Sequence, residues 1–159
     1  VLVNNAGMSA VFDSSEAVTE EWYDKVLSVN LKGAFRLSAV IGARMFEQGS
    51  GAIVNISSIA AIRPGFDHAP YAMAKAALNN MTEAHAKEYG PKVRVNAIMP
   101  GSFRTDIAKH WHPDKEKNTP AALKRFGEPE EIVSTVLYLA SEASSFTTGA
   151  IVRVDGGRP

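Results

Sequence analysis

Hydrophobic and polar residues follow two different spacings along the chain and predict strands that alternate with helices. Short apolar runs bounded by turn residues are typical of buried strands. Such runs lie at residues 1–3, 52–56, 93–98 and 151–154. Apolar residues repeated every three or four positions predict long helices over 20–46 and 71–89, and a shorter one over 129–140.

Helix-starting and helix-stopping residues support these limits. Thr19 is a good N-cap, and Glu20 and Glu21 follow it in a first turn where the helix dipole favours acidic side chains. Gly90-Pro91 ends the second helix, and Pro129 suits the first position of the third.

This alternation predicts an α/β fold, in which apolar strands joined by helices form a parallel sheet covered on both faces. Ligands of such sheets bind beyond the carboxyl ends of the strands. The residues at those ends are Asn4 to Gly7, Ser57-Ser58 and Pro100-Gly101. We expect a single domain over 1–159, in which the polar segment 102–125 forms a flap.

Composition and charge exclude several functional classes. The 17 basic and 17 acidic residues balance, which argues against a nucleic-acid-binding protein. The absence of cysteine excludes a disulfide scaffold and a thiolate metal site or nucleophile. We also expect no membrane-spanning segment and no signal peptide, and therefore a cytoplasmic protein.

The beginning of the chain indicates that it is part of something longer. It has no initiator Met and opens on Val1-Leu2-Val3, inside an apolar strand-like run. A processed mature terminus is the alternative interpretation.

Tyr71 and Lys75 form a candidate acid/base pair. They lie four residues apart on a predicted helix and therefore share one face. A free tyrosine titrates near pH 10, and a neighbouring ammonium would lower its pKa. By spacing alone, such a pair is more often an ordinary helix-surface contact.

Other polar residues have structural and functional interpretations. Ser57 and Ser58 follow a strand, where a hydroxyl could donate to a carbonyl oxygen or simply stabilise a turn. Asn30 lies within a predicted helix and could be a harmless polar residue. His110 and His112 flank Trp111, but two histidines without nearby carboxylates are a poor ligand set, so we expect no metal site.

Taken together, these segments make the chain resemble the short-chain dehydrogenase/reductase family over essentially its whole length. The family motifs occur in order: Asn4-Asn5-Ala6-Gly7; Ser28-Val29-Asn30; Asn55-Ile56-Ser57-Ser58; Tyr71-Ala72-Met73-Ala74-Lys75; Arg94-Val95-Asn96 before Pro100-Gly101; Thr105-Asp106; and Val154-Asp155-Gly156-Gly157. The single-domain branch that includes 3-oxoacyl-carrier-protein reductases is the most similar. Ala74 stands where Ser is common in the family.

The resemblance implies an oxidoreductase that interconverts a carbonyl and a secondary alcohol with NAD or NADP. It selects Ser58 over Ser57 as the residue that holds the substrate oxygen, and Tyr71 as the proton donor or acceptor. Lys75 would lower the pKa of Tyr71 and bind the nicotinamide ribose. Asn30 would hold a water that connects Lys75 to solvent.

The resemblance also implies binding residues. Besides Tyr71 and Lys75, those expected at the cofactor are Asn5, Ala6, Gly7, Pro100, Gly101, Phe103 and Thr105. The flap would cover a small-molecule carbonyl or alcohol substrate, whose pocket would include Ile59, His68 and Trp111. The two long helices would form a homo-oligomer, a dimer or a tetramer.

The chain departs from the family pattern mainly at the N-terminal part of the family fold. Its first strand and its glycine-rich phosphate turn are absent, so the resemblance implies an incomplete Rossmann-like sheet with strands 4-5-6-7 of the family order. The strand at residues 1–4 would be an exposed hydrophobic edge. We therefore expect weak or no cofactor affinity for these 159 residues alone.

Two alternatives come from other functional classes. The first is a truncated, non-catalytic relative that acts as an interaction module or has lost its function. The second is a hydrolase or metal enzyme on a similar sheet, but the sequence contains no G-x-S-x-G, H-E-x-x-H or P-loop motif to support it.

Overall fold

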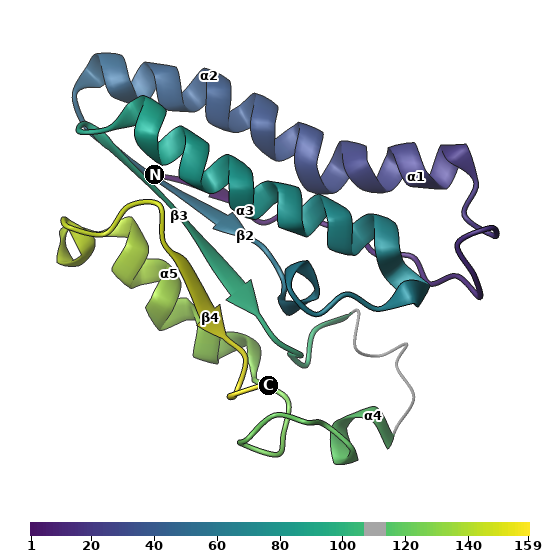
Figure 1. The fold of residues 1–159 in the computed structure, drawn as a ribbon. Coiled ribbons are helices and arrows are strands. Elements are labelled where there is room, and N and C mark those ends of the chain that lie inside the picture. The colour runs from purple at the N-terminus through teal and green to yellow at the C-terminus, as the bar shows by residue number, and fades with distance from the viewer. Residues whose placement is uncertain (107–113) are drawn as a thin grey trace.

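The predicted parallel α/β sheet is confirmed in the computed structural model, which describes residues 1–106 and 114–159. Its strands are β1 Leu2–Asn4, β2 Gly51–Ile56, β3 Val93–Pro100 and β4 Ile151–Val154. They follow one another across the sheet in the order β1-β2-β3-β4, and every neighbouring pair is parallel (Figure 1). All described carboxyl ends therefore lie at one edge of the sheet.

Helices connect these strands much as the hydrophobic spacing predicts. Their bounds are α1 Glu20–Leu27, α2 Gly33–Gln48, α3 Ala69–Tyr89, α4 Asp114–Lys117 and α5 Val133–Ala140. Thr19 caps α1 by accepting from the Trp22 backbone N–H, as expected. A 3₁₀ turn over Pro129–Ile132 starts the last predicted helix.

The long helix predicted over 20–46 contains a change of geometry that its apolar spacing does not reveal. A π-helical segment, Ser28–Lys32, joins α1 to α2. Within it, the Asn30 side chain donates to the Val26 carbonyl oxygen one turn earlier, at 2.8 Å. Single π turns inside α-helices often mark functional positions.

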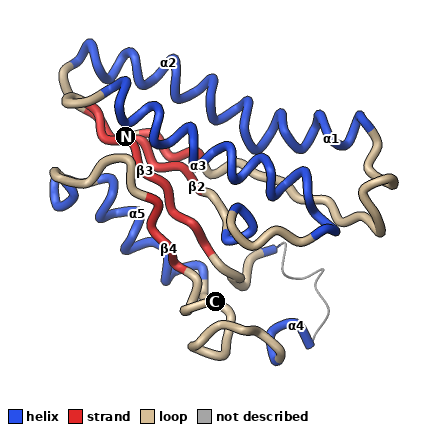
Figure 2. The backbone as a smooth tube through the Cα atoms, viewed as in Figure 1, coloured by secondary structure: helices blue, strands red, loops and turns tan. Residues whose placement is uncertain are grey.

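Helices cover both faces of the sheet. The α1–α2 rod and α3 lie side by side over one face, and α5 lies on the opposite face (Figure 2). Because successive strand residues point to opposite faces, Ile53 packs beneath α2 and α3 while Val54 packs towards α5. The sheet is therefore doubly covered, as its apolar strands predict.

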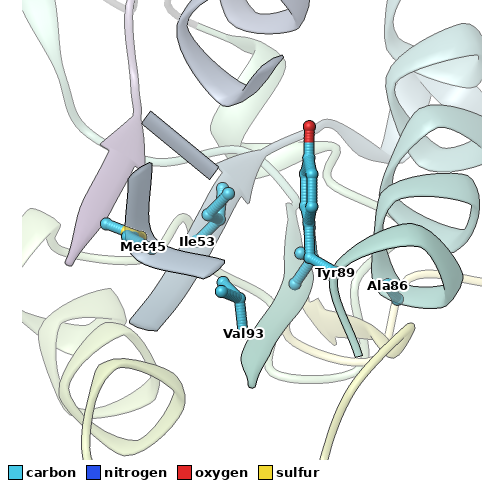
Figure 3. Packing of buried hydrophobic residues seen from close by; sticks show 6 residues of the cluster. Met45, Ile53, Ala86, Tyr89 and Val93 are labelled. Carbon is cyan, nitrogen blue, oxygen red and sulfur yellow. The ribbon is translucent and has the colours of Figure 1, made fainter. Parts of the chain in front are cut away.

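The larger core cluster lies between the sheet and the α2–α3 layer (Figure 3). Ile53 and Val95, from neighbouring strands, are fully buried. Met45 from α2 and Tyr89 from α3 close over them. This packing fixes the C-terminal half of α3, and so holds the whole helix against the sheet.

Gly42 allows the close approach of α2 to α3. A Cβ at this position would lie 2.6 Å from Tyr89 Cε2 in the core. We expect Gly42→Ala to destabilise the fold by about 1–3 kcal/mol through overpacking, despite the higher helix propensity of alanine. Urea unfolding measures this change. Gly33→Ala is the matched control, because its Cβ would make only an ordinary 3.5 Å contact and the variant should be neutral or more stable.

Side chains at and next to β1 are more exposed than expected, since the apolar run at residues 1–3 predicts a buried strand. Val1 is 70% exposed and Val3 is 41% exposed, so the prediction of a buried strand end is wrong for these side chains. In the described residues β1 pairs with β2 alone, which leaves its other edge uncovered. The hydrophobic edge expected at residues 1–4 is present.

The expectation that no segment is long and apolar enough to span a membrane also needs correction. In the described ranges, the continuous helix Glu20–Gln48 is long and apolar enough to cross a membrane by length and composition alone. In the fold, the same helix packs along α3 and the sheet. Its Asn30 and Ser38 side chains are polar and fully buried within the fold, which is typical of a helix that packs against other protein elements.

Candidate active site

The chemistry-bearing residues gather at the carboxyl edge of the sheet. Ser57 and Ser58 follow β2 directly, and Ser57 N–H donates to the Ile98 carbonyl at 2.7 Å, so it continues the ladder with β3. The chain then returns through a 3₁₀ turn, Ile59–Ala61, to the start of α3, which carries Tyr71 and Lys75. The strand end and the helix start therefore face each other.

Tyr71 and Lys75 share one face of α3, as their spacing predicts. Lys75 Nζ lies 5.6 Å from the centroid of the Tyr71 ring. Lys75 is 3% exposed, and its ammonium donates to the Ile56 carbonyl oxygen at 2.8 Å. The Ser58 side chain lies close enough to the Tyr71 hydroxyl to lower the pKa of Tyr71. Thus Ser58, Tyr71 and Lys75 form one cluster.

The two adjacent serines have different partners. Ser58 is half-buried, caps the following turn by accepting from Ala60 N–H at 3.2 Å, and reaches Tyr71. Ser57 is almost fully buried, and its hydroxyl donates to the main-chain carbonyl of Lys75 at 3.2 Å. Ser58 is therefore the serine that can approach a group held at Tyr71.

The pKa of Tyr71 differs from the sequence expectation. Burial raises the pKa of Tyr71 above its usual value, although the nearby Ser58 hydroxyl acts in the opposite direction. The expectation that Lys75 lowers this pKa stays a prediction, since the net shift is upward and comes from burial. The reason is that removal of the phenol from water disfavours the phenolate more than the nearby hydroxyl favours it.

Burial also changes the acid/base properties of Lys75. Because the ammonium loses its hydration, the pKa of Lys75 falls to about 8. A lysine with this pKa can gain or lose a proton close to neutral pH, which is typical of functional sites.

The depressed pKa of Lys75 predicts a dependence of stability on pH. Between pH 8 and 10.5, the unfolded chain holds this proton and the folded chain does not, so stability rises with pH. We expect the free energy of unfolding to rise by about 3 kcal/mol across this window relative to a Lys75→Met variant. Urea unfolding of both proteins at several pH values measures the difference. Parallel curves would contradict the prediction.

Asn30 lies beside this cluster, but in the part of the chain that the structure describes its side chain hydrogen-bonds to Met8 and Val26 and not to Tyr71 or Lys75. Its amide is 1% exposed and exchanges two hydrogen bonds with the backbone of Met8, at 2.7 and 3.2 Å. The side chain therefore anchors the segment after β1 to the π turn.

The turn Asn5-Ala6-Gly7 passes close to the lysine ammonium. A Cβ at Gly7 would lie 3.1 Å from Asn30 Oδ1 and 3.5 Å from Lys75 Nζ. An ammonium has three N–H donors, and the Ile56 carbonyl takes one. The exposed turn and the remaining lysine donors fit a ligand that carries hydroxyl groups.

The predicted substrate-pocket residues have mixed outcomes. The His68 ring lies 6.2 Å from the Tyr71 ring between centroids, and its Nδ1 lies 2.5 Å from Asp67 Oδ1. Ile59 is buried in the turn after Ser58. Trp111, like His110 and His112, lies outside the described residues. His68 is therefore the predicted pocket residue that the structure places beside Tyr71.

The segment after β3 is anchored to the C-terminal strand. Gly101 N–H donates to the Val154 carbonyl at 2.9 Å, which fixes the turn begun by Pro100. Phe103 packs on Gly127 and lines a cavity of about 170 Å³. The described lining of this cavity includes neither Tyr71 nor Lys75, so Phe103 lies against another space. Thr105 is exposed.

Sequence reasoning missed several groups in the cluster. Asp67 orients His68, and the adjacent Asp-His pair was a signal that could have identified it. The Ile56 carbonyl and the Ser57 hydroxyl both hold Lys75. No sequence pattern assigns a backbone carbonyl to a lysine, because that contact depends on how α3 docks on β2.

The chain is similar to known reductases and dehydrogenases along its length. Residues 1–158 match the family model described as enoyl-(acyl carrier protein) reductase. The 3-oxoacyl-[acyl-carrier-protein] reductase of Thermotoga maritima is 40% identical over 161 residues, which cover 99% of this chain and 65% of that enzyme.

Solved structures show the same fold. A short chain dehydrogenase/reductase family protein has a TM-score of 0.89 and 36% identity, with 98% of this chain and 65% of that one covered. The candidate NAD(P)-dependent gluconate 5-dehydrogenase of Beutenbergia cavernae, which has NADP bound at low occupancy, has a TM-score of 0.92 and 37% identity, with 98% and 64% covered. The chain thus spans a little under two thirds of the length of each of these relatives.

Proposed function

Because the chain belongs to the short-chain dehydrogenase/reductase family, we propose that it carries the proton-transfer site of an NAD(P)-dependent oxidoreductase. The reaction is the interconversion of a carbonyl and a secondary alcohol. The observation that carries this proposal is that three side chains lie together: the buried ammonium of Lys75 is 5.6 Å from the centroid of the Tyr71 ring, and Ser58 is close enough to lower the pKa of Tyr71.

Each of these three side chains has a distinct role. The Ser58 hydroxyl binds and orients the substrate oxygen. Tyr71 gives its phenolic proton to that oxygen during reduction and takes it back during oxidation. Since burial keeps the pKa of Tyr71 high, the phenol is protonated at neutral pH and is ready to act as a donor. The positive charge of Lys75 stabilises the phenolate that remains.

The residues around Lys75 fit a nicotinamide cofactor. When bound, such a cofactor would supply or accept a hydride. The turn Asn5-Ala6-Gly7 passes beside Lys75, and the two lysine donors not used by the Ile56 carbonyl suit ribose hydroxyls. The NADP-bound relative supports this class of cofactor, with no preference between NAD and NADP.

Other parts of the proposed site have supporting roles. His68, held by Asp67 and with its ring 6.2 Å from that of Tyr71, would line the substrate pocket. Asn30 anchors Met8 and shapes the approach to Lys75, and a water held there would relay protons as the resemblance implies. Pro100 and Gly101 border the nicotinamide end, while Phe103 and Thr105 belong to the flap over 102–125.

A homo-oligomer and a cytoplasmic location stay predictions. Exposed apolar side chains on the two long helices support an oligomer. They include Trp22, Phe35, Leu37, Val40 and Met73. The similarity to reductases and dehydrogenases does not favour the alternative of a non-catalytic module.

Ser58→Ala tests the proposed function. We expect kcat to fall about 10²–10³-fold, because a polarising donor at the reacting oxygen is lost. The assay follows NADH or NADPH absorbance with a panel of short ketones and 3-oxoacyl thioesters, using the protein at its natural length. Ser145→Ala, on an exposed turn, is the matched control and should keep wild-type turnover. Equal turnover of Ser58→Ala and wild type would contradict the assignment.

A further inference from the structure

We infer that Ser57, the residue before the proposed substrate-binding serine, is a positioning residue that fixes Lys75 within the active site. This inference rests on the proposed function, because it concerns the same site. The hydroxyl of Ser57 is almost fully buried and donates to the main-chain carbonyl oxygen of Lys75 at 3.2 Å. It is directed at α3 and not towards the space that a substrate would enter.

The contact of Ser57 with α3 is an additional bond to the helix. The Lys75 carbonyl lies within the continuous helix Ala69–Tyr89, where the N–H four residues later is its regular donor. A carbonyl oxygen has two acceptor positions, so it can accept from Ser57 as well. The serine therefore does not cap a helix end, and its removal leaves the helical hydrogen-bond partner of the carbonyl in place.

Lys75 is held at both of its ends by consecutive residues of the same strand end. The Ile56 carbonyl accepts from Lys75 Nζ at 2.8 Å, and the Ser57 hydroxyl binds the Lys75 main chain. Lysine has many rotamers, and restricting both ends of the residue fixes where its ammonium lies. These two contacts, which we call the Ser57 clamp, therefore set the position of the positive charge relative to Tyr71.

The position of Ser57 is itself fixed by the sheet. Its N–H donates to the Ile98 carbonyl of β3 at 2.7 Å, so the strand ladder extends to this residue. Ser58 follows directly and lies close to Tyr71. Three consecutive residues, 56 to 58, thus contact the lysine ammonium, the lysine main chain and the tyrosine. Movement of α3 against β2 would disturb all three contacts together.

The Ser57 clamp predicts a larger effect on catalysis than on folding. Ser57→Ala removes a single neutral hydrogen bond, which is worth about 1 kcal/mol of stability. Small displacements of groups in an active site cost far more, and about 1 Å can lower the rate 10²-fold. We expect Ser57→Ala to lower kcat about 10- to 100-fold with little change in KM.

The pKa of Lys75 gives a readout that does not depend on turnover. In protein labelled at lysine ¹³Cε, an NMR titration reports the protonation of Lys75, and the signal is assigned by its absence in Lys75→Met. We expect a wild-type midpoint near 8. In Ser57→Ala, water reaches the loosened ammonium, so the midpoint should rise by about one pH unit.

Two further variants separate a positioning role of Ser57 from a general effect on stability. Ser57→Thr keeps the hydroxyl and should keep the wild-type midpoint and most of kcat. Ser38→Ala is the matched control, because Ser38 is equally buried and accepts from Asn4 Nδ2 at 2.9 Å, in the core between α2 and the sheet. It should lower stability without changing the Lys75 midpoint.

The combined outcomes decide the inference. An unchanged Lys75 midpoint and unchanged kcat in Ser57→Ala would overturn it. So would equal losses of kcat in Ser57→Ala and Ser38→Ala at equal stability, because the role would then be merely structural. Absence of oxidoreductase activity in the wild type would overturn the proposed function alone, since the titration would still decide whether Ser57 positions Lys75.

Discussion

Replacing Tyr71 by phenylalanine is expected to lower kcat by about 10²–10⁴-fold, because the variant has no proton to transfer to the substrate oxygen. The ring of phenylalanine keeps the packing of the tyrosine beside His68 and Lys75. Loss of the hydroxyl removes a neighbour of Ser58, but Ser58 still accepts from Ala60 N–H. The fold should therefore be nearly unchanged while turnover is lost.

Stopped-flow or steady-state measurement of NADH or NADPH consumption tests this expectation in the protein at its natural length. Tyr23→Phe is the matched control, because Tyr23 lies on α1 with 37% of its surface exposed and is remote from the cluster in the sequence. This control should keep wild-type kcat. Wild-type turnover in Tyr71→Phe, with the ketone still reduced, would show that another group supplies the proton.

Much of the fold could be predicted from residue spacing, since local patterns determine where strands and helices begin and end. The run 151–154 forms β4 as predicted, and Thr19 caps α1. The parallel direction of the strands follows from the general rules for sheets covered by helices, whereas their order was implied by the family resemblance. The π turn at Ser28–Lys32 could not be predicted from local spacing. Its Asn30 side chain hydrogen-bonds to the backbone of Met8, which lies 22 residues earlier in the chain.

The site could be predicted in part for a similar reason. Tyr71 and Lys75 lie one helical turn apart, so sequence alone places them on one face. Residue pattern alone left Ser57 and Ser58 undistinguished, and only the family resemblance selected Ser58. Their separate partners depend on the docking of α3 on β2. The raised pKa of Tyr71 also could not be predicted from the sequence, because burial is a property of the folded chain.

A buried chain of hydrogen-bonded polar side chains lies next to the site, and we expect its loss to lower the free energy of unfolding strongly. Asn55 of β2 is fully buried, and its Oδ1 accepts from Asn4 Nδ2 at 2.8 Å while its Nδ2 donates to Thr82 Oγ1 at 2.9 Å. Asn4 also donates to Ser38 of α2, and Thr82 donates to the Leu78 carbonyl within α3. These bonds join two strands and two helices through their side chains.

Because Asn55 is the central member of this chain, Asn55→Ala breaks two buried hydrogen bonds and opens a cavity. We expect a loss of about 2–4 kcal/mol in the free energy of unfolding, a large share of the roughly 5–15 kcal/mol typical of a domain. The midpoint of urea unfolding measures it, provided that the slope is unchanged. Asn80→Ala, at an exposed position of α3, should shift the midpoint little. A loss in Asn55→Ala no larger than in this control would mean that the polar chain adds nothing to the docking of α3. Apolar packing and the bonds from Ile56 and Ser57 to Lys75 would then hold the helix against the sheet.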